Sequence, residues 1–152
     1  MAAVKGVVFD MDDTLYPERD YVRSGFQAVV DYLANHYNIY SQAAFSFLWS
    51  GFQEGRRGHA FDLLIEATSG LAQRVTPQDL VQVYRTHQPT IQVIPEMACL
   101  MDDLLQIGIP MSLISDGPLE AQSRKVEALG LSRWMQHIYL TDQWGKDFWK
   151  PH

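Results

Sequence analysis

The chain has 152 residues, of which 47% are hydrophobic, so it can bury a core as one domain or as a small domain with an insert. It carries 12 basic and 18 acidic residues, a net charge of -6, and has no basic run, which argues against nucleic acid as a partner. The single cysteine, Cys99, excludes an internal disulfide. The first apolar run is too short for a signal peptide, and no apolar stretch approaches membrane-spanning length, so we expect a cytoplasmic protein outside the membrane.

The N-terminal segment predicts a buried strand. Residues 4–10, VKGVVFD, form a nearly continuous apolar run that ends in a carboxylate, which is typical of a strand covered on both faces of a parallel sheet.

Residues 16–93 predict helices and no convincing strand. Apolar side chains recur at helical spacing over 22–33 and again over 45–52, where Trp49 and Phe52 are interpreted as core side chains. A third helix is expected over 59–69. Thr76 followed by Pro77 is typical of the start of a fourth helix, because threonine caps and proline fits the first turn. The segment therefore reads as a helical insert.

Beyond residue 94, helices and strands alternate. A helix is predicted from Pro95 to the stop at Gly108, with an inward face made of Met97, Leu100, Met101, Leu104 and Leu105. Residues 109–115, IPMSLIS, predict a second strand, and residues 137–141, HIYLT, a third. The helix between these strands opens after residues 116–118, should place Val126 and Leu129 inward, and ends at Gly130.

This order predicts an α/β fold with a parallel sheet and right-handed crossovers. Residues 1–15 and 94–152 would form the core, and residues 16–93 a cap inserted into it. Open parallel sheets bind ligands at the carboxyl ends of their strands. Asp10 and Ser115 both follow such ends.

The segment Asp10-Met11-Asp12-Asp13-Thr14 has the residue types that phosphoryl transfer needs. A carboxylate at a strand end can attack phosphorus if a cation offsets the repulsion between the two anions. A second carboxylate can protonate the leaving oxygen and later activate water, and a hydroxyl with turning amides can hold the phosphoryl group. The simpler alternative is an ordinary acidic turn, with Asp13 solvated or acting as a cap.

FDMDDTL resembles the first signature of the haloacid dehalogenase superfamily, whose phosphatase members carry D-x-D-x-T after the first strand. The resemblance implies that Asp10 is the nucleophile and a metal ligand. It implies that Asp12 is the general acid/base, with its backbone carbonyl on Mg²⁺, and that Thr14 supports the loop. The implied fold is a parallel sheet of Rossmann-like topology with a helical cap of the C1 type.

Two further segments resemble the other signatures of this family. LISDG, residues 113–117, resembles the second one, which implies that Ser115 hydrogen-bonds the phosphoryl group and assigns Asp116 and Gly117 to substrate binding. Lys150-Pro151 resembles the third, whose lysine neutralises the nucleophile and the phosphoryl oxygens. Lys146 is a weaker competitor for that role, and a merely solvated terminal lysine is the simpler alternative.

Family members continue through a helix and a fourth strand to an acidic signature that supplies further Mg²⁺ ligands, whereas the present sequence stops at His152. The resemblance therefore implies a C-terminally truncated core and a weak metal site. It also implies a bare edge on the first strand, so we expect strand-edge pairing, with a homo-oligomer as one outcome.

The insert is expected to determine the substrate. Caps of this kind are typical of family members that enclose a small phosphorylated metabolite and exclude water. Arg56 and Arg57, between Gly55 and Gly58, are the candidates for substrate binding, and a solvated turn between helices is the equal alternative.

Three other functions are alternatives to a Mg²⁺-dependent phosphatase. A haloacid dehalogenase proper needs neither Mg²⁺ nor an acid two residues after the nucleophile, so Asp12 argues against it. A receiver-type phosphoacceptor carries its aspartate on a middle strand, so Asp10 is misplaced for it. A catalytically inactive binding scaffold is the remaining alternative.

Overall fold

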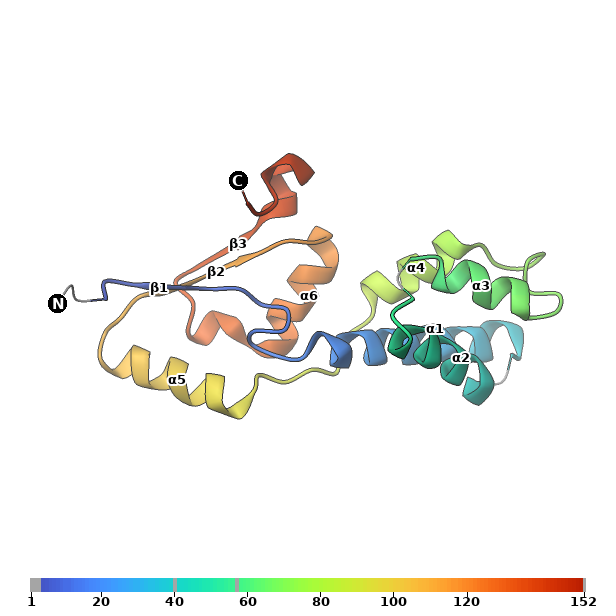
Figure 1. Cartoon of the computed structure of the whole chain (residues 1–152), viewed down its shortest axis with the longest axis horizontal. Coiled ribbons are helices and arrows are strands. Elements are labelled where there is room, and N and C mark those ends of the chain that lie inside the picture. The colour runs from blue at the N-terminus through green and yellow to red at the C-terminus, as the bar shows by residue number, and fades with distance from the viewer. Residues whose placement is uncertain (1–3, 40, 57, 152) are drawn as a thin grey trace. The chain divides into compact units, whose positions relative to one another are not determined.

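The computed structural model describes residues 4–39, 41–56 and 58–151, and the chain divides into two compact units (Figure 1). One unit comprises Met1–Tyr21 with Gln88–His152, and the other comprises Val22–His87. Among the described helices, none combines the length with the apolar character that a membrane span requires.

The first unit is built on a parallel sheet with the strand order β1-β2-β3. The strands are β1 (Val7–Phe9), β2 (Met111–Ser115) and β3 (His137–Leu140). Val8 is opposite Ser112 in the first pair, and Leu113 is opposite Ile138 in the second. All three predicted strands are confirmed. Each is shorter than its apolar run.

Two helices cover one face of this sheet. They are α5 (Pro95–Gln106), which lies below the strands in Figure 1, and α6 (Leu119–Leu129), which descends beside their right-hand ends. The side chains that alternate toward this face are buried, among them Phe9, Met111, Leu113 and Leu140. Those on the opposite face are more open, as for Val8, which is 62% exposed. Among the described residues β1 pairs only with β2, so it is an edge strand.

The inward faces of α5 and α6 differ from the predicted ones. On α5, Met101 is fully buried, whereas Leu100 and Leu105 are 43% and 52% exposed. Leu100 is about 100° around the helix from Met101, and Leu105 is in the last turn, so the contact is a narrow stripe. On α6, Val126 is only half-buried. The buried residues of α6 are Ala121, Gln122, Lys125 and Leu129.

Short 3₁₀ helices complete the first unit. They are η1 (Leu131–Arg133), η2 (Thr141–Trp144) and η3 (Lys146–Phe148). Gly130 ends α6 with φ 61°, a left-handed conformation that glycine adopts without steric strain, as the sequence predicted.

The second unit is helical throughout its described residues. Its helices are α1 (Glu18–Tyr37), which begins in the first unit, α2 (Ser41–Gln53), α3 (Ala60–Ala67) and α4 (Pro77–Thr86). Thr76 caps α4 in a reciprocal pair with Asp79, and Pro77 occupies its first turn, as predicted. Trp49 and Phe52 stack on each other and pack against the buried core, which includes Phe26, Val29, Leu33, Leu48, Leu64 and Leu80.

Candidate active site

The loop after β1 turns back on itself and projects the acidic residues. Met11 is fully buried and its carbonyl accepts from the N–H groups of Thr14 and Leu15 at 3.3 and 2.9 Å. Thr14 is half-buried in this turn. Asp13 adopts φ 52° and its carboxylate accepts from the N–H of Glu18, at the start of α1, at 2.8 Å. Asp13 therefore acts as a helix cap.

Asp10 and Lys150 meet at the carboxyl end of the sheet. The ammonium of Lys150 lies 2.6 Å from Asp10 Oδ1 and donates to the carbonyl of Ile114 at 3.0 Å. Both side chains are about half exposed, at 41% and 47%. Lys146, the competing candidate, instead lies 6.0 Å from the centroid of the Trp149 ring.

Asp116 anchors the segment that carries Lys150. One of its carboxylate oxygens accepts from the hydroxyl of Thr141 at 2.6 Å, and the other accepts from the backbone N–H of Lys150 at 3.0 Å. Both oxygens thus have protein donors. The adjacent Gly117 has φ 125°, and a Cβ there would lie 2.9 Å from Gln122 Nε2, so glycine is required for two reasons.

The carboxylate of Asp12 lies in a cradle of three donors, which we define as Tyr16, Gln122 and Lys125. Lys125 Nζ lies 2.7 Å from Asp12 Oδ1, which also accepts from the hydroxyl of Tyr16. Gln122 Nε2 donates to Asp12 Oδ2 at 2.9 Å, to Ser115 Oγ at 3.0 Å and to the carbonyl of Asp116. Gln122 therefore links the second acid of the loop to the serine at the end of β2.

The cradle determines the protonation of Asp12. Burial raises the pKa of this carboxyl, but the Lys125 charge and the hydrogen bonds from Lys125, Tyr16 and Gln122 outweigh it and lower the pKa below its usual value. Burial, followed by the hydrogen bond to Asp12, raises the pKa of the Tyr16 hydroxyl. Asp12 is therefore ionised and Tyr16 neutral in this arrangement at neutral pH.

Sequence reasoning missed Gln122 and Lys125. Both are nearly buried, and they face the sheet together with Leu129 at the spacing i, i+3, i+7. The available signal was the presence of two polar residues on the helix face where apolar residues are expected. Such a pair implies polar partners inside the unit, because buried polar groups need hydrogen bonds.

The structure brings together the residues Asp10, Asp12, Ser115, Asp116 and Lys150, all within the first unit. Among residues 4–39, 41–56 and 58–151, no three side chains of His, Cys, Asp or Glu converge into a metal-binding group.

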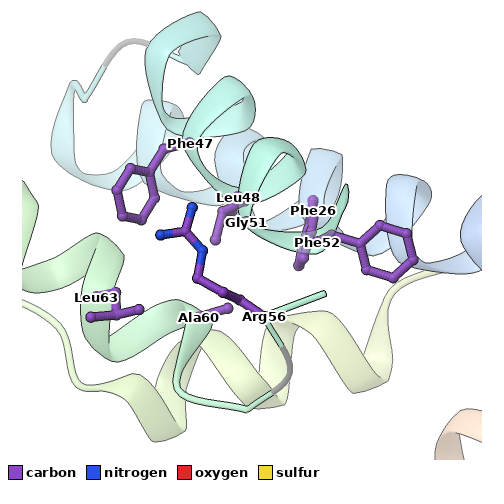
Figure 2. Close-up of a pocket in the computed structure, with 8 residues that line it drawn as sticks. All are labelled: Phe26, Phe47, Leu48, Gly51, Phe52, Arg56, Ala60 and Leu63. Atoms are coloured by element: carbon purple, nitrogen blue, oxygen red, sulfur yellow. The ribbon is translucent and has the colours of Figure 1, made fainter. Parts of the chain in front are cut away.

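Arg56 lies in the second unit, where its guanidinium reaches across Gly51 into a small pocket lined largely by apolar side chains (Figure 2). The cavity has a volume of about 20 Å³, enough for about one water molecule. Arg56 also pairs with Glu54 at 3.0 Å. Its assignment to substrate binding stays a prediction, and Arg57 lies outside the described residues.

Comparison with known protein families identifies the family to which the chain belongs. Residues 4–152 match the family described as haloacid dehalogenase-like hydrolases. The chain belongs to this family. Within it, the chain is similar to a glyceraldehyde 3-phosphate phosphatase of Methanocaldococcus jannaschii, with 24% identity over 98% of the chain.

Two solved structures have the same fold. One is a protein from Thermotoga maritima described as a beta-phosphoglucomutase. Its structure aligns with 91% of the chain at a TM-score of 0.56 and 16% identity. The other is a haloacid dehalogenase-like (HAD) hydrolase from Bacillus subtilis, whose structure was solved with bound magnesium. It aligns with 93% of the chain at a TM-score of 0.54 and 16% identity. The chain spans 66% of the archaeal phosphatase and 62% and 65% of the two solved chains.

Proposed function

We propose that the protein is a Mg²⁺-dependent phosphohydrolase that acts on a small phosphorylated metabolite through an aspartyl phosphate. The proposal rests on two sets of contacts at the same end of the sheet. Asp10 lies beside the ammonium of Lys150, and Gln122 hydrogen-bonds both Asp12 and Ser115. A nucleophile, a charge-neutralising lysine, a second acid and a phosphoryl-binding hydroxyl are the groups that the reaction uses. The archaeal relative, a phosphatase of a triose phosphate, supports a substrate of this class.

In the first step, a carboxylate oxygen of Asp10 attacks phosphorus and the bond from phosphorus to the leaving oxygen breaks, while the ionised Asp12 takes the proton of the phosphate monoanion and passes it to that oxygen. In the second step, Asp12 takes a proton from water as the water oxygen attacks phosphorus, and the bond to Asp10 breaks. Ser115 and Lys150 hold the phosphoryl oxygens during both steps. The phosphate then takes this proton from Asp12, so the products are an alcohol, inorganic phosphate and the two original carboxylates.

The oxygen donors of this loop fit Mg²⁺, which prefers carboxylate and carbonyl oxygens and keeps several waters. The carboxylate of Asp10 and the backbone carbonyl of Asp12 would hold it. When bound, the cation would offset the repulsion between Asp10 and the phosphate.

The test is hydrolysis of phosphomonoesters with and without Mg²⁺. The wild-type protein should release phosphate only with Mg²⁺, and Asp10→Asn should lose nearly all turnover because an amide is a poor nucleophile. Undiminished turnover by Asp10→Asn would rule out the covalent mechanism.

A binding scaffold is the second candidate, favoured by the finding that, among the described residues, no three His, Cys, Asp or Glu side chains form a group that could hold a metal ion. It predicts phosphate-ester binding to wild-type protein and no turnover at any Mg²⁺ concentration.

A further inference from the structure

We propose that Lys125 is a positioning residue for the acid/base Asp12, a role that rests on the function proposed above. Lys125 is in the second half of α6, with its ammonium 2.7 Å from Asp12 Oδ1 and its side chain only 7% exposed. A lysine is almost never this buried unless its charge is paired.

The surroundings of Lys125 leave its ammonium little freedom. It lies 4.2 Å from the centroid of the Tyr21 ring, within the range of a cation–π interaction. Gln122, three residues earlier on the same helix face, donates to the other oxygen of Asp12 at 2.9 Å. The helix α6 therefore holds each carboxylate oxygen separately, which fixes both the position and the rotation of the carboxylate.

The cradle leaves room for one more hydrogen bond. An ionised carboxylate offers about four acceptor positions. Lys125 and Tyr16 use two on Oδ1, and Gln122 uses one on Oδ2. The remaining position is on Oδ2, and the amide nitrogen that binds Oδ2 is also 3.0 Å from the hydroxyl of Ser115. The free acceptor position is thus on the oxygen that shares the Gln122 donor with the proposed phosphoryl-binding serine.

Stability alone is a poor explanation for the pair. Buried ion pairs are often replaced by apolar residues without loss of stability, so a buried lysine on the carboxylate proposed to move protons indicates a role in the reaction. Lys125 would act by holding Asp12, without touching the substrate.

Two substrates with different leaving groups distinguish a role of Lys125 in positioning Asp12 from a general loss of structure in the variant. An alkyl phosphate such as glycerol 3-phosphate needs a proton on its poor leaving oxygen, whereas 4-nitrophenyl phosphate departs readily without one. Lys125→Met should therefore lower kcat/KM, which reports phosphoryl transfer to Asp10, at least about tenfold more for the alkyl ester than for the aryl ester. Lys125→Arg, which keeps the charge, should recover part of the selective loss.

Two further variants sharpen the result. Tyr16→Phe removes another cradle donor and should show the same selectivity for the alkyl ester, which matters if Lys125→Met folds poorly. Lys5→Met, at an exposed lysine, should change neither rate. Equal losses on both esters, or no loss, would overturn the positioning role.

An NMR measurement, which does not depend on turnover, distinguishes failure of this inference from failure of the proposed function. In wild-type protein, the Lys125 ammonium should give a slowly exchanging NMR signal that Asp12→Asn abolishes. If wild type hydrolyses neither ester, the proposed function fails whatever the signal shows. If the signal is absent from wild type, the pairing itself is wrong.

Discussion

The ammonium of Lys150 lies 2.6 Å from the carboxylate of Asp10, although the two residues are 140 positions apart in the chain. The contact depends on Asp116, whose carboxylate accepts from the backbone N–H of Lys150 at 3.0 Å. One acid after β2 thus positions the cation that faces the acid after β1.

Lys150→Met should lower kcat/KM for phosphomonoesters by about 10²-fold, because a positive charge aimed at the developing charge of the transition state is lost. Lys146→Met is the matched control, since Lys146 lies near the Trp149 ring. Steady-state kinetics on both variants check this. An equal loss in Lys146→Met would mean that the whole C-terminal segment had been disturbed.

Asp102 on α5 should give a measurable pH dependence of stability. The hydrogen bond from Trp134 and, against a smaller effect of burial, the neighbouring Arg133 lower its pKa in the folded protein. A depressed folded pKa means that the stabilisation is complete above the unfolded value, about 3.9, and is lost as pH falls through the folded value. Wild type should exceed Asp102→Asn in free energy of unfolding at pH 7, and the difference should shrink below about pH 4.

A double-mutant cycle with Trp134→Phe isolates the cause. Trp134 Nε1 donates to Asp102 at 2.7 Å, so the pH-dependent part of the difference should be smaller in the Phe background. Urea unfolding followed by circular dichroism at several pH values measures it. A difference that grows as the solution is acidified would contradict the assignment.

The strands and most helix boundaries followed from local pattern, because apolar runs and caps act over a few residues. Thr76 and Pro77 mark the start of α4 as clearly in the structure as in the sequence. The inward face of α5 was predicted too wide, since periodicity shows which residues share a face but not how much of it is covered. Leu100 and Leu105 are exposed for that reason.

The candidate site was only partly predictable. Asp10, Asp12 and Ser115 stand at strand ends, a place that sequence pattern identifies. Gln122 and Lys125 bind Asp12 from a helix more than 100 residues away, and only the tertiary fold creates those contacts. Their burial could have been suspected from helical spacing, but their partner could not.

Gly25 in α1 should resist substitution for a steric reason. A Cβ there would lie 2.5 Å from Tyr84 Cδ2 and 3.2 Å from His87 Cε1. The Tyr84 ring is packed 5.9 Å from Phe26 and 5.8 Å from Phe61 between centroids, so it has little room to withdraw. We expect Gly25→Ala to lower the free energy of unfolding by about 1–3 kcal/mol despite the better helix propensity of alanine.

Gly51→Ala is the matched control for Gly25→Ala, because it places the same substitution inside α2. The atoms nearest its Cβ would be those of the Arg56 guanidinium, with Nε at 3.1 Å, at the end of a flexible and half-exposed side chain. Thermal unfolding should show no loss, with a gain of up to about 1 kcal/mol from helix propensity. Similar losses in both variants would show that Tyr84 is not the obstacle.

Residues 1–152 should bind Mg²⁺ weakly. The ligands proposed from this chain are one carboxylate, on Asp10, and one backbone carbonyl, on Asp12, and Mg²⁺ held by so few protein oxygens depends on water and substrate phosphate for the rest of its shell. Calorimetry should therefore give a dissociation constant on the order of 1 mM for Mg²⁺ alone. Inorganic phosphate should tighten Mg²⁺ binding, and Mg²⁺ should tighten phosphate binding by the same factor, because the coupling free energy between two ligands is reciprocal. Asp10→Asn should abolish the binding, whereas Asp102→Asn, which removes the same charge on α5, should leave it intact. Tight binding that survives Asp10→Asn would place the cation at another site and remove the metal from the proposed reaction.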